Sequence, residues 1–268
     1  MRQIGFIGAG NMGSAIIRGV VQSGFMKAGQ ITIWDTSRKR MEELAEEMPS
    51  LQVAASSMDL ARRCDMIVLA VKPHLIGGVI DEMLPVLNGK SIISIAAGWT
   101  VRMLSNALRG TDATYLRVMP NTPAMIGEGM TALCDESSFS KEDFAFAKGI
   151  FDAVGRTVIL PERLFDGVIA ISGSSPAYVY MMIEAMADAG VKEGLPRPCA
   201  YEMAAQAVLG AALLVLSSGT HPAALKDAVC SPGGTTIEAV EELERKGFRA
   251  AIMDAMGACA QKSRDMSM

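Results

Sequence analysis

The sequence predicts a two-domain α/β protein, in which a doubly wound, mostly parallel sheet is followed by an all-α domain. Short apolar strands alternate with helical stretches over the first 160 residues, which is the pattern of βαβ units. A glycine-rich turn directly follows the first strand, and no strand pattern occurs after residue 161. We therefore predict two domains, residues 1–161 and residues 162–268.

The first strand and the first helix flank the glycine-rich turn. A short apolar strand covers residues 3–7, and residues 14–23 have the apolar spacing of a helix. In such a turn the first glycine permits the tight bend, the second lets the backbone approach a pyrophosphate, and the third allows close helix–strand packing. Glycines also occur at ordinary turns, but the flanking strand and helix favour a dinucleotide-binding Rossmann domain. We expect the whole turn to contact the cofactor: Gly8, Ala9, Gly10, Asn11, Met12 and Gly13.

The second predicted strand, residues 31–35, ends in an aspartate at the position where an acidic residue usually binds the ribose 2′-hydroxyl of NAD. Two hydroxyl residues and two cationic residues follow directly, and these suit the 2′-phosphate of NADP instead. The same segment is equally typical of a capped helix start before residues 38–48, with Thr36 or Ser37 as the N-cap. The choice between NADPH and NADH therefore stays open. We include these residues in the cofactor site: Asp35, Thr36, Ser37 and Arg38.

The remaining elements of the first domain continue the alternation. Further strands are predicted at 65–71, 91–96, 114–119, 130–134 and 156–160. Helices are predicted near 38–48, 74–87, 100–108 and 140–153. This order predicts a doubly wound sheet, and such sheets bind ligands outside the carboxyl ends of their strands.

Three loops follow those carboxyl ends, at 70–73, 96–98 and 119–123. Their small residues allow close approach to a flat ring and their prolines hold the loops rigid, so we expect them to frame the nicotinamide. The cofactor contacts expected beyond the glycine turn and the second strand are Ser57, Ala70, Val71, Lys72, Pro73, Ala96, Ala97, Gly98 and Asn121. Asn121 is also typical of an asparagine that satisfies its own turn. Lys72 suits phosphate, ribose, substrate carboxylate or solvent, and we assign it no role in proton transfer.

The second domain is predicted to consist of helices near 162–170, 175–193, 197–217, 222–229, 235–246 and 249–264. The longest apolar run, residues 203–216, is shorter than the roughly 20 residues that span a bilayer, so we expect a buried helix. A helix that is apolar all round is found buried, so a homodimer is expected to cover it. The methionines cluster mildly at Met181, Met182 and Met186, where we expect them to fill the core.

Composition narrows the function further. A net charge of −4 without an obvious cluster of Lys and Arg argues against a nucleic-acid surface. Five irregularly spaced cysteines fit neither a disulfide framework nor a metal site, and they favour reduced thiols in a cytoplasmic protein. No signal peptide is expected, because the predicted cofactor strand begins almost at the first residue. We therefore expect no metal, no nucleic acid and no membrane among the partners.

Several longer motifs carry a family resemblance. They are GFIGAGNMG (5–13), AVKP (70–73), SIAAG (94–98), RVMPNTPA (117–124), SGSSPAYVYMMIEAMADAGV (172–191) and HPAALKDAVCSPGGTTIEAVEELERKGFRAA (221–251). Through these motifs the chain resembles a pyrroline-5-carboxylate reductase over nearly its whole length. The resemblance implies reduction of L-1-pyrroline-5-carboxylate to L-proline with NADPH or NADH. It also implies a helical domain that dimerises so that each active site lies near the subunit interface, and it leaves larger assemblies of dimers open.

The same resemblance assigns the substrate site to a second glycine-rich loop at 231–236. The family's substrate carboxylate is held there by Ser231 and by the backbone amides of Gly233, Gly234 and Thr235 at a helix N-terminus. Thr236 is the catalytic residue by this carry-over, since its hydroxyl reaches the ring nitrogen. A capped turn in which Pro232 opens the helix is the structural alternative.

Other polar groups near these motifs receive smaller roles. Ser174, Ser175 and Pro176 are expected to wall the nicotinamide side of the pocket, or else only to start a helix. The two histidines, His74 and His221, are interpreted as loop or helix-end residues.

Two other functions fit parts of the pattern. A 3-hydroxyacid dehydrogenase has a similar plan but needs a catalytic lysine on the long helix after the boundary, and no lysine occurs between Lys148 and Lys192. A non-catalytic nucleotide-binding sensor would share the fold, since fold alone does not fix function. Retention of the 231–236 loop opposes that alternative.

Overall fold

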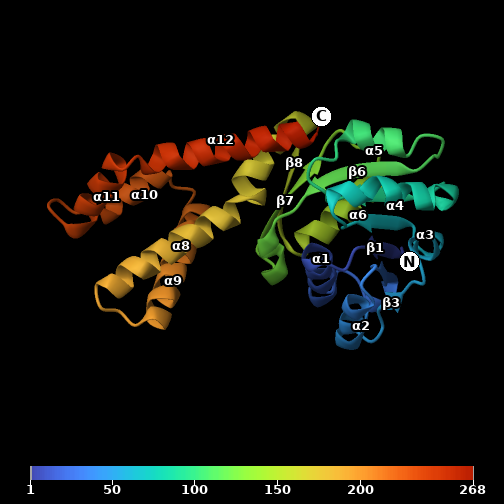
Figure 1. The fold of residues 1–268 in the computed structure, drawn as a ribbon, viewed down its shortest axis with the longest axis horizontal. Helices are drawn as coiled ribbons and strands as arrows, with labels where there is room; N and C mark the ends of the chain where they lie inside the picture. Colours follow the sequence, from blue (N-terminus) through green and yellow to red (C-terminus); the bar gives the residue numbers. More distant parts are fainter. Residues whose placement is uncertain (1, 268) are drawn as a thin grey trace. The chain divides into compact units, whose positions relative to one another are not determined.

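Residues 2–267 of the chain are described in a computed structural model (Figure 1). They form two compact units. The first comprises the chain up to Ser174 together with the residues from Cys259 onward, and the second is Ser175–Ala258. The domain boundary at residue 161 stays a prediction.

The first unit is built on an eight-stranded sheet in the order β3-β2-β1-β4-β5-β6-β7-β8. Its strands are β1 Ile4–Ile7, β2 Ile31–Trp34, β3 Gln52–Val53, β4 Met66–Leu69, β5 Ser91–Ser94, β6 Thr114–Met119, β7 Gly129–Cys134 and β8 Gly155–Leu160. All neighbours are parallel except β6 and β7, which confirms the prediction of a mostly parallel sheet. The sequence pattern misses β3, because this strand has two residues and both are exposed.

Helices cover both faces of the sheet, as a doubly wound fold requires. One face packs against α1 Asn11–Gln22, α2 Arg38–Glu47 and α6 Lys141–Asp152. The other packs against α3 Ser57–Arg63, α4 Ile76–Met83 and α5 Val101–Ala107. Short 3-10 turns complete the unit: η1 Ala28–Gln30, η2 Pro73–Leu75, η3 Leu84–Val86, η4 Thr122–Ile126 and η5 Glu162–Leu164.

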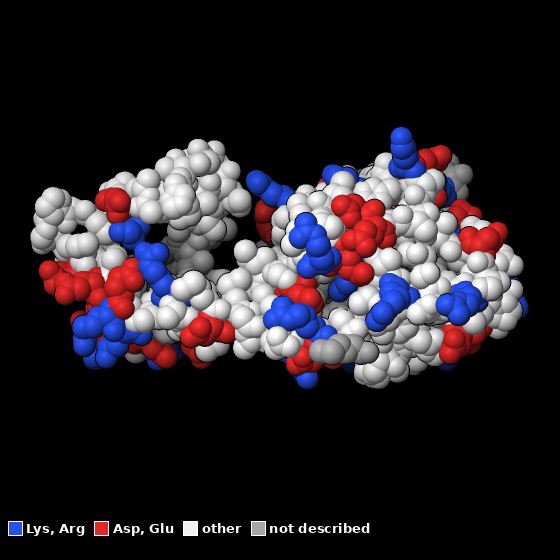
Figure 2. Space-filling model, turned by 90° about the horizontal axis from the view of Figure 1, so that it is seen from above, with Lys and Arg blue, Asp and Glu red and all other residues white. Residues whose placement is uncertain are grey.

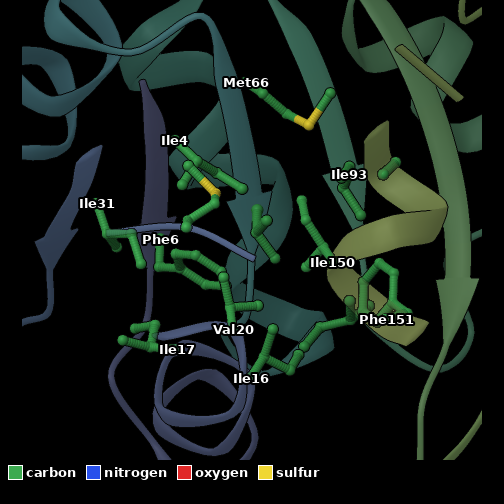
Figure 3. Close-up of a cluster of buried hydrophobic side chains, with 14 of the residues drawn as sticks. Ile4, Phe6, Ile16, Ile17, Val20, Ile31, Met66, Ile93, Ile150 and Phe151 are labelled. Atoms are coloured by element: carbon green, nitrogen blue, oxygen red, sulfur yellow. The ribbon is translucent and has the colours of Figure 1, made fainter. Parts of the chain in front are cut away.

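The core on the α1 side brings strand and helix residues together, as Figure 3 shows. Phe6 from β1, Ile16 from α1 and Phe151 from α6 are fully buried in it. Burial of each such side chain contributes roughly 1.5–3 kcal/mol. This packing holds the first strand and its following helix in the orientation that the glycine turn requires.

A partly buried ion pair joins the end of the sheet to the segment that follows it. Arg117 of β6, 4% exposed, lies 2.7 Å from Glu162 and stacks over the Phe165 ring at 4.7 Å. The same Glu162 oxygen accepts the backbone N–H of Val101 at 2.6 Å, so β6, α5 and η5 are tied at one point. The chain continues through α7 Phe165–Val168 and the π-helix η6 Ile169–Gly173.

The helices of the C-terminal half confirm the predicted pattern. They are α8 Ser175–Lys192, α9 Arg197–Ser218, α10 Pro222–Val229, α11 Thr235–Arg245 and α12 Phe248–Met266. The last turns of α12 belong to the first unit. There Ser263 donates to Asp166 at 2.6 Å, and Cys259 donates to Ser174 Oγ at 3.2 Å.

The helical unit has almost no core of its own. Its buried residues are three alanines, Ala187, Ala200 and Ala204, among the residues described for Ser175–Ala258. Residues 203–216 are not buried within the single chain, where Leu209, Leu213 and Leu214 are about half exposed, so their expected burial by a second copy stays a prediction. By length and composition alone, α9 is also apolar enough to cross a membrane, a property that core helices of soluble proteins share.

The expected core role of the methionine cluster is wrong for two of its members. The exposed fractions are 69% for Met181 and 41% for Met186, and Met182 is half-buried. These side chains have too few neighbours within one copy of the unit to be covered.

Charged residues of both signs lie interspersed on the surface in view in Figure 2.

Candidate active site

The glycine turn lies where strands β1 and β4 part, at the switch point of the sheet. Gly8 has a φ of +106°, and a Cβ added there would lie 2.6 Å from the carbonyl oxygen of Ala70. A Cβ on Gly13 would lie 2.1 Å from the Gly8 oxygen. Both positions therefore demand glycine, for the reasons that the fingerprint implies.

The centre of the turn has the room and polarity that a pyrophosphate needs. Gly10 is the N-cap of α1, and a Cβ added to it would meet nothing within 4 Å. Gly10 has no side chain to cap this helix, so the first-turn amides of Asn11, Met12 and Gly13 can donate to an anion. These residues fit a dinucleotide.

Asp35 is tied to the turn by its side chain. Its Oδ2 accepts the backbone N–H of Ala9 at 2.7 Å, and its Oδ1 accepts that of Ser37 at 2.7 Å. The carboxylate is 9% exposed, and Arg40 lies 3.9 Å from Oδ2. Both oxygens are therefore engaged within the protein.

The segment after Asp35 does start a helix, with Ser37 as the N-cap of α2. The Ser37 hydroxyl makes no capping hydrogen bond, and the exposed Arg38 pairs with Glu42 at 2.7 Å. A hollow of about 720 Å³ opens here. It is lined by Trp34, Asp35, Thr36, Arg38, Met41, Glu42, Ala45, Val53, Ala54, Ala55 and Arg63. Its position beside β2 suits an adenosine.

Ser57, the first residue of α3, is fully buried. Its hydroxyl has no hydrogen-bond partner within the described residues, while the neighbouring Ser56 caps the helix through Asp59. It does not line the hollow, and its cofactor role stays a prediction.

Two of the three loops expected at the nicotinamide are joined by a residue that the sequence analysis missed. The indole N–H of Trp99 donates to the Pro73 carbonyl at 2.8 Å, which links 96–98 to 70–73. On the other side a Cβ on Gly98 would lie 3.3 Å from Met266 Cβ of α12. The signal for Trp99 was present, an aromatic residue directly after the predicted loop. Lys72 is exposed at the start of η2.

Both polar atoms of the Asn121 side chain form hydrogen bonds within the protein. Its amide nitrogen donates to the Ser172 carbonyl at 3.0 Å, and its oxygen accepts the N–H of Met130 at 2.8 Å. The side chain thus holds β7 against η6. Contact with the cofactor stays a prediction for Asn121.

The second glycine loop opens α11 in the helical unit. Gly234 is the N-cap, and its N–H donates to the Ser231 carbonyl at 3.0 Å, so this amide is already used by the turn. Thr235 and Thr236 occupy the first helical turn, whose amides have no intrahelical acceptor. The carboxylate role predicted for Ser231, Gly233, Gly234 and Thr235 remains a prediction, as does the contact of Thr236.

The histidine interpretations are confirmed. His221 caps α10, where its Nδ1 accepts the N–H of Ala223 at 3.2 Å. His74 lies within η2.

Comparison with known proteins matches the chain from end to end. It is 47% identical to the pyrroline-5-carboxylate reductase of Escherichia coli K12 over 267 residues, covering 99% of this chain and 98% of the relative. The chain belongs to the pyrroline-5-carboxylate reductase family. Family models match residues 162–266 as "Pyrroline-5-carboxylate reductase dimerisation" and residues 3–98 as "NADP oxidoreductase coenzyme F420-dependent".

Solved structures of the family agree with the fold. The Plasmodium falciparum pyrroline carboxylate reductase with NADP bound has a TM-score of 0.91 at 34% identity, covering 100% of this chain and 98% of that one. The 1-pyrroline-5-carboxylate reductase of Streptococcus pyogenes has a TM-score of 0.87 at 39% identity, covering 98% of each chain. The predicted reductase fold, a sheet domain followed by a helical one, is confirmed.

Proposed function

We propose that the protein reduces L-1-pyrroline-5-carboxylate to L-proline with NADPH, as the last step of proline synthesis. The observation that carries this is the 47% identity over 99% of the chain, which spans both the cofactor turn and the 231–236 loop. Bound NADPH supplies a hydride from nicotinamide C4 to the imine carbon. The main task of the protein is therefore to position two reactants.

The sheet unit performs the cofactor half of this task. The turn at Gly8–Gly13 directs helix amides at the pyrophosphate, and Thr36 with Arg38 receives the ribose 2′-phosphate in the hollow beside β2. Support for NADPH comes from the relative solved with NADP bound and from the uncapped start of α2. The loops 70–73 and 96–98 frame the nicotinamide.

The helical unit performs the substrate half. Ser231, Gly233, Gly234 and Thr235 hold the carboxylate at the start of α11, and Thr236 hydrogen-bonds the ring nitrogen. The Gly234 amide must leave its bond to Ser231 in order to take part, or the first-turn amides act without it. The imine is protonated and already electrophilic, so no strong general acid is needed.

A homodimer accounts for the exposed apolar helices. The large apolar side chains of α8 and α9 are covered by a second copy rather than by lipid, which agrees with the dimerisation family matched at 162–266. A cytoplasmic location fits the five free cysteines.

The decisive experiment is the initial rate of NADPH oxidation, and separately of NADH oxidation, on addition of L-1-pyrroline-5-carboxylate. Rapid oxidation with formation of proline is the expected result. Folded protein that binds nucleotide but turns over neither cofactor would overturn the proposal and favour a sensor or a different imine substrate.

A further inference from the structure

The strand-end acid Asp35 is engaged on both sides within the protein. Its two oxygens accept two backbone N–H groups, one from Ala9 in the glycine turn and one from Ser37 at the start of α2. The Arg40 guanidinium lies 3.9 Å from the oxygen that faces the turn. A buried carboxylate is stable only when paired in this way.

Ala9 is held from the opposite side as well. Its carbonyl oxygen accepts the hydroxyl of Ser14 at 2.8 Å, and the residue is buried. Ala9 lies between Gly8, which is packed on Ala70, and Gly10, which faces open space. Both peptide groups of Ala9 are therefore fixed, and with them the path of the backbone that approaches the pyrophosphate.

An acid at this position would select NADH if its oxygens were offered to the ribose hydroxyls. Here both oxygens accept hydrogen bonds from backbone N–H groups of the protein. We propose that Asp35 is a positioning residue, which shapes the phosphate-binding turn through the Ala9 N–H and does not discriminate NADPH from NADH. This inference rests on the proposed reductase function for its kinetic test.

The preference for NADPH over NADH distinguishes a positioning role of Asp35 from a role in choosing the cofactor. In Asp35→Ala both acceptors are lost, and the KM for NADPH and the KM for NADH rise together by roughly tenfold, as for loss of a hydrogen bond to a charged group. The ratio of kcat/KM for the two cofactors stays within about twofold of the parent value. The KM for the pyrroline substrate and kcat at saturating cofactor stay unchanged.

Two further variants make the comparison sharp. Ser14→Ala removes the other hold on Ala9 and should raise both cofactor KM values in parallel, by a smaller factor. Arg38→Ala should weaken NADPH alone and shift the ratio toward NADH. If Asp35→Ala fails to fold, Asp35→Asn replaces it, since its single oxygen retains one of the two bonds and places an NH₂ against the other N–H.

A cofactor ratio that moves by tenfold or more toward NADPH in Asp35→Ala would overturn the proposal, as would unchanged KM values for both cofactors. Direct titration of NADPH by its fluorescence repeats the test without turnover. Absence of activity in the parent protein would therefore count against the reductase function, while the binding titration would still decide the role of Asp35.

Discussion

The indole nitrogen of Trp99 lies 2.8 Å from the carbonyl oxygen of Pro73 and donates a hydrogen bond to it. The loop after β5 is in this way tied to the loop after β4, although the two bonded residues are 26 positions apart along the chain. The bond is made by a side chain that is half-buried against the core beneath α4.

Replacing Trp99 by Phe should loosen these loops while keeping an aromatic ring in the core. Loss of one hydrogen bond of about 1 kcal/mol predicts a rise of roughly fivefold in the KM for NADPH. Steady-state rates with varied NADPH measure the effect. Tyr115→Phe is the matched control in the same apolar cluster, at the start of β6. An equal loss in the control would show that the core, and not the loop contact, is responsible.

Thr236→Ala should lower kcat/KM for the pyrroline substrate by about tenfold or more, because one substrate hydrogen bond is lost. NADPH binding should persist, since Thr236 lies in the helical unit. Thr235→Ala keeps its backbone amide and should lose less. Unaltered kcat/KM in Thr236→Ala would remove this residue from the substrate site.

Burial raises the pKa of the Cys134 thiol to about 11. Because the pKa of this thiol is higher in the folded than in the unfolded protein, folding favours the protonated thiol. The stabilising contribution is therefore fully present below pH 9 and is lost as the pH rises toward 11. At 1.36 kcal/mol per pKa unit, the free energy of unfolding should lose about 2–3 kcal/mol across this window. Urea unfolding at several pH values measures the loss. Cys134→Ala should show a flatter decline, and equal slopes would contradict the assignment.

Cys230 directly precedes the 231–236 loop and is partly exposed. Modification of this thiol should inactivate the enzyme, because a bulky group there would displace Ser231. Cys230→Ser should resist thiol reagents. Cys199 is the natural comparison, as it is exposed on α9, and Cys199→Ser should remain as sensitive as the parent. Unchanged sensitivity of Cys230→Ser would exclude this thiol as the target.

Local sequence patterns predict the sheet domain well, because the determinants of that domain are local. Gly13 approaches the Gly8 carbonyl, which the fingerprint spacing itself brings close, whereas Gly8 approaches Ala70 in the loop after β4. The strand β3 is missed, since two exposed residues carry no periodicity. Hydrogen bonds between distant segments, such as Asp35 to Ala9 and Asn121 to Ser172, depend on tertiary placement and leave no pattern in the sequence.

The residues of the candidate site also differ in whether local sequence or tertiary placement determines them. The residues proposed to contact a ligand through backbone amides are predicted from glycine positions, whereas the Trp99–Pro73 hydrogen bond and the approach of Met266 to Gly98 join segments far apart in the chain. The wrong prediction of burial for the methionines has a different cause. Apolarity predicts that Met181 will be covered, but it does not say whether its own chain or a second copy does the covering.

The three buried alanines of the helical unit bear on how the protein behaves at low concentration. If the apolar faces of α8 and α9 are covered only by a second copy, folding of this unit and association are one equilibrium. The melting temperature should then rise with protein concentration. Activity measured at nanomolar enzyme should decay with time after dilution, and proteolysis of diluted samples should begin within Ser175–Ala258 while the nucleotide-binding sheet stays intact.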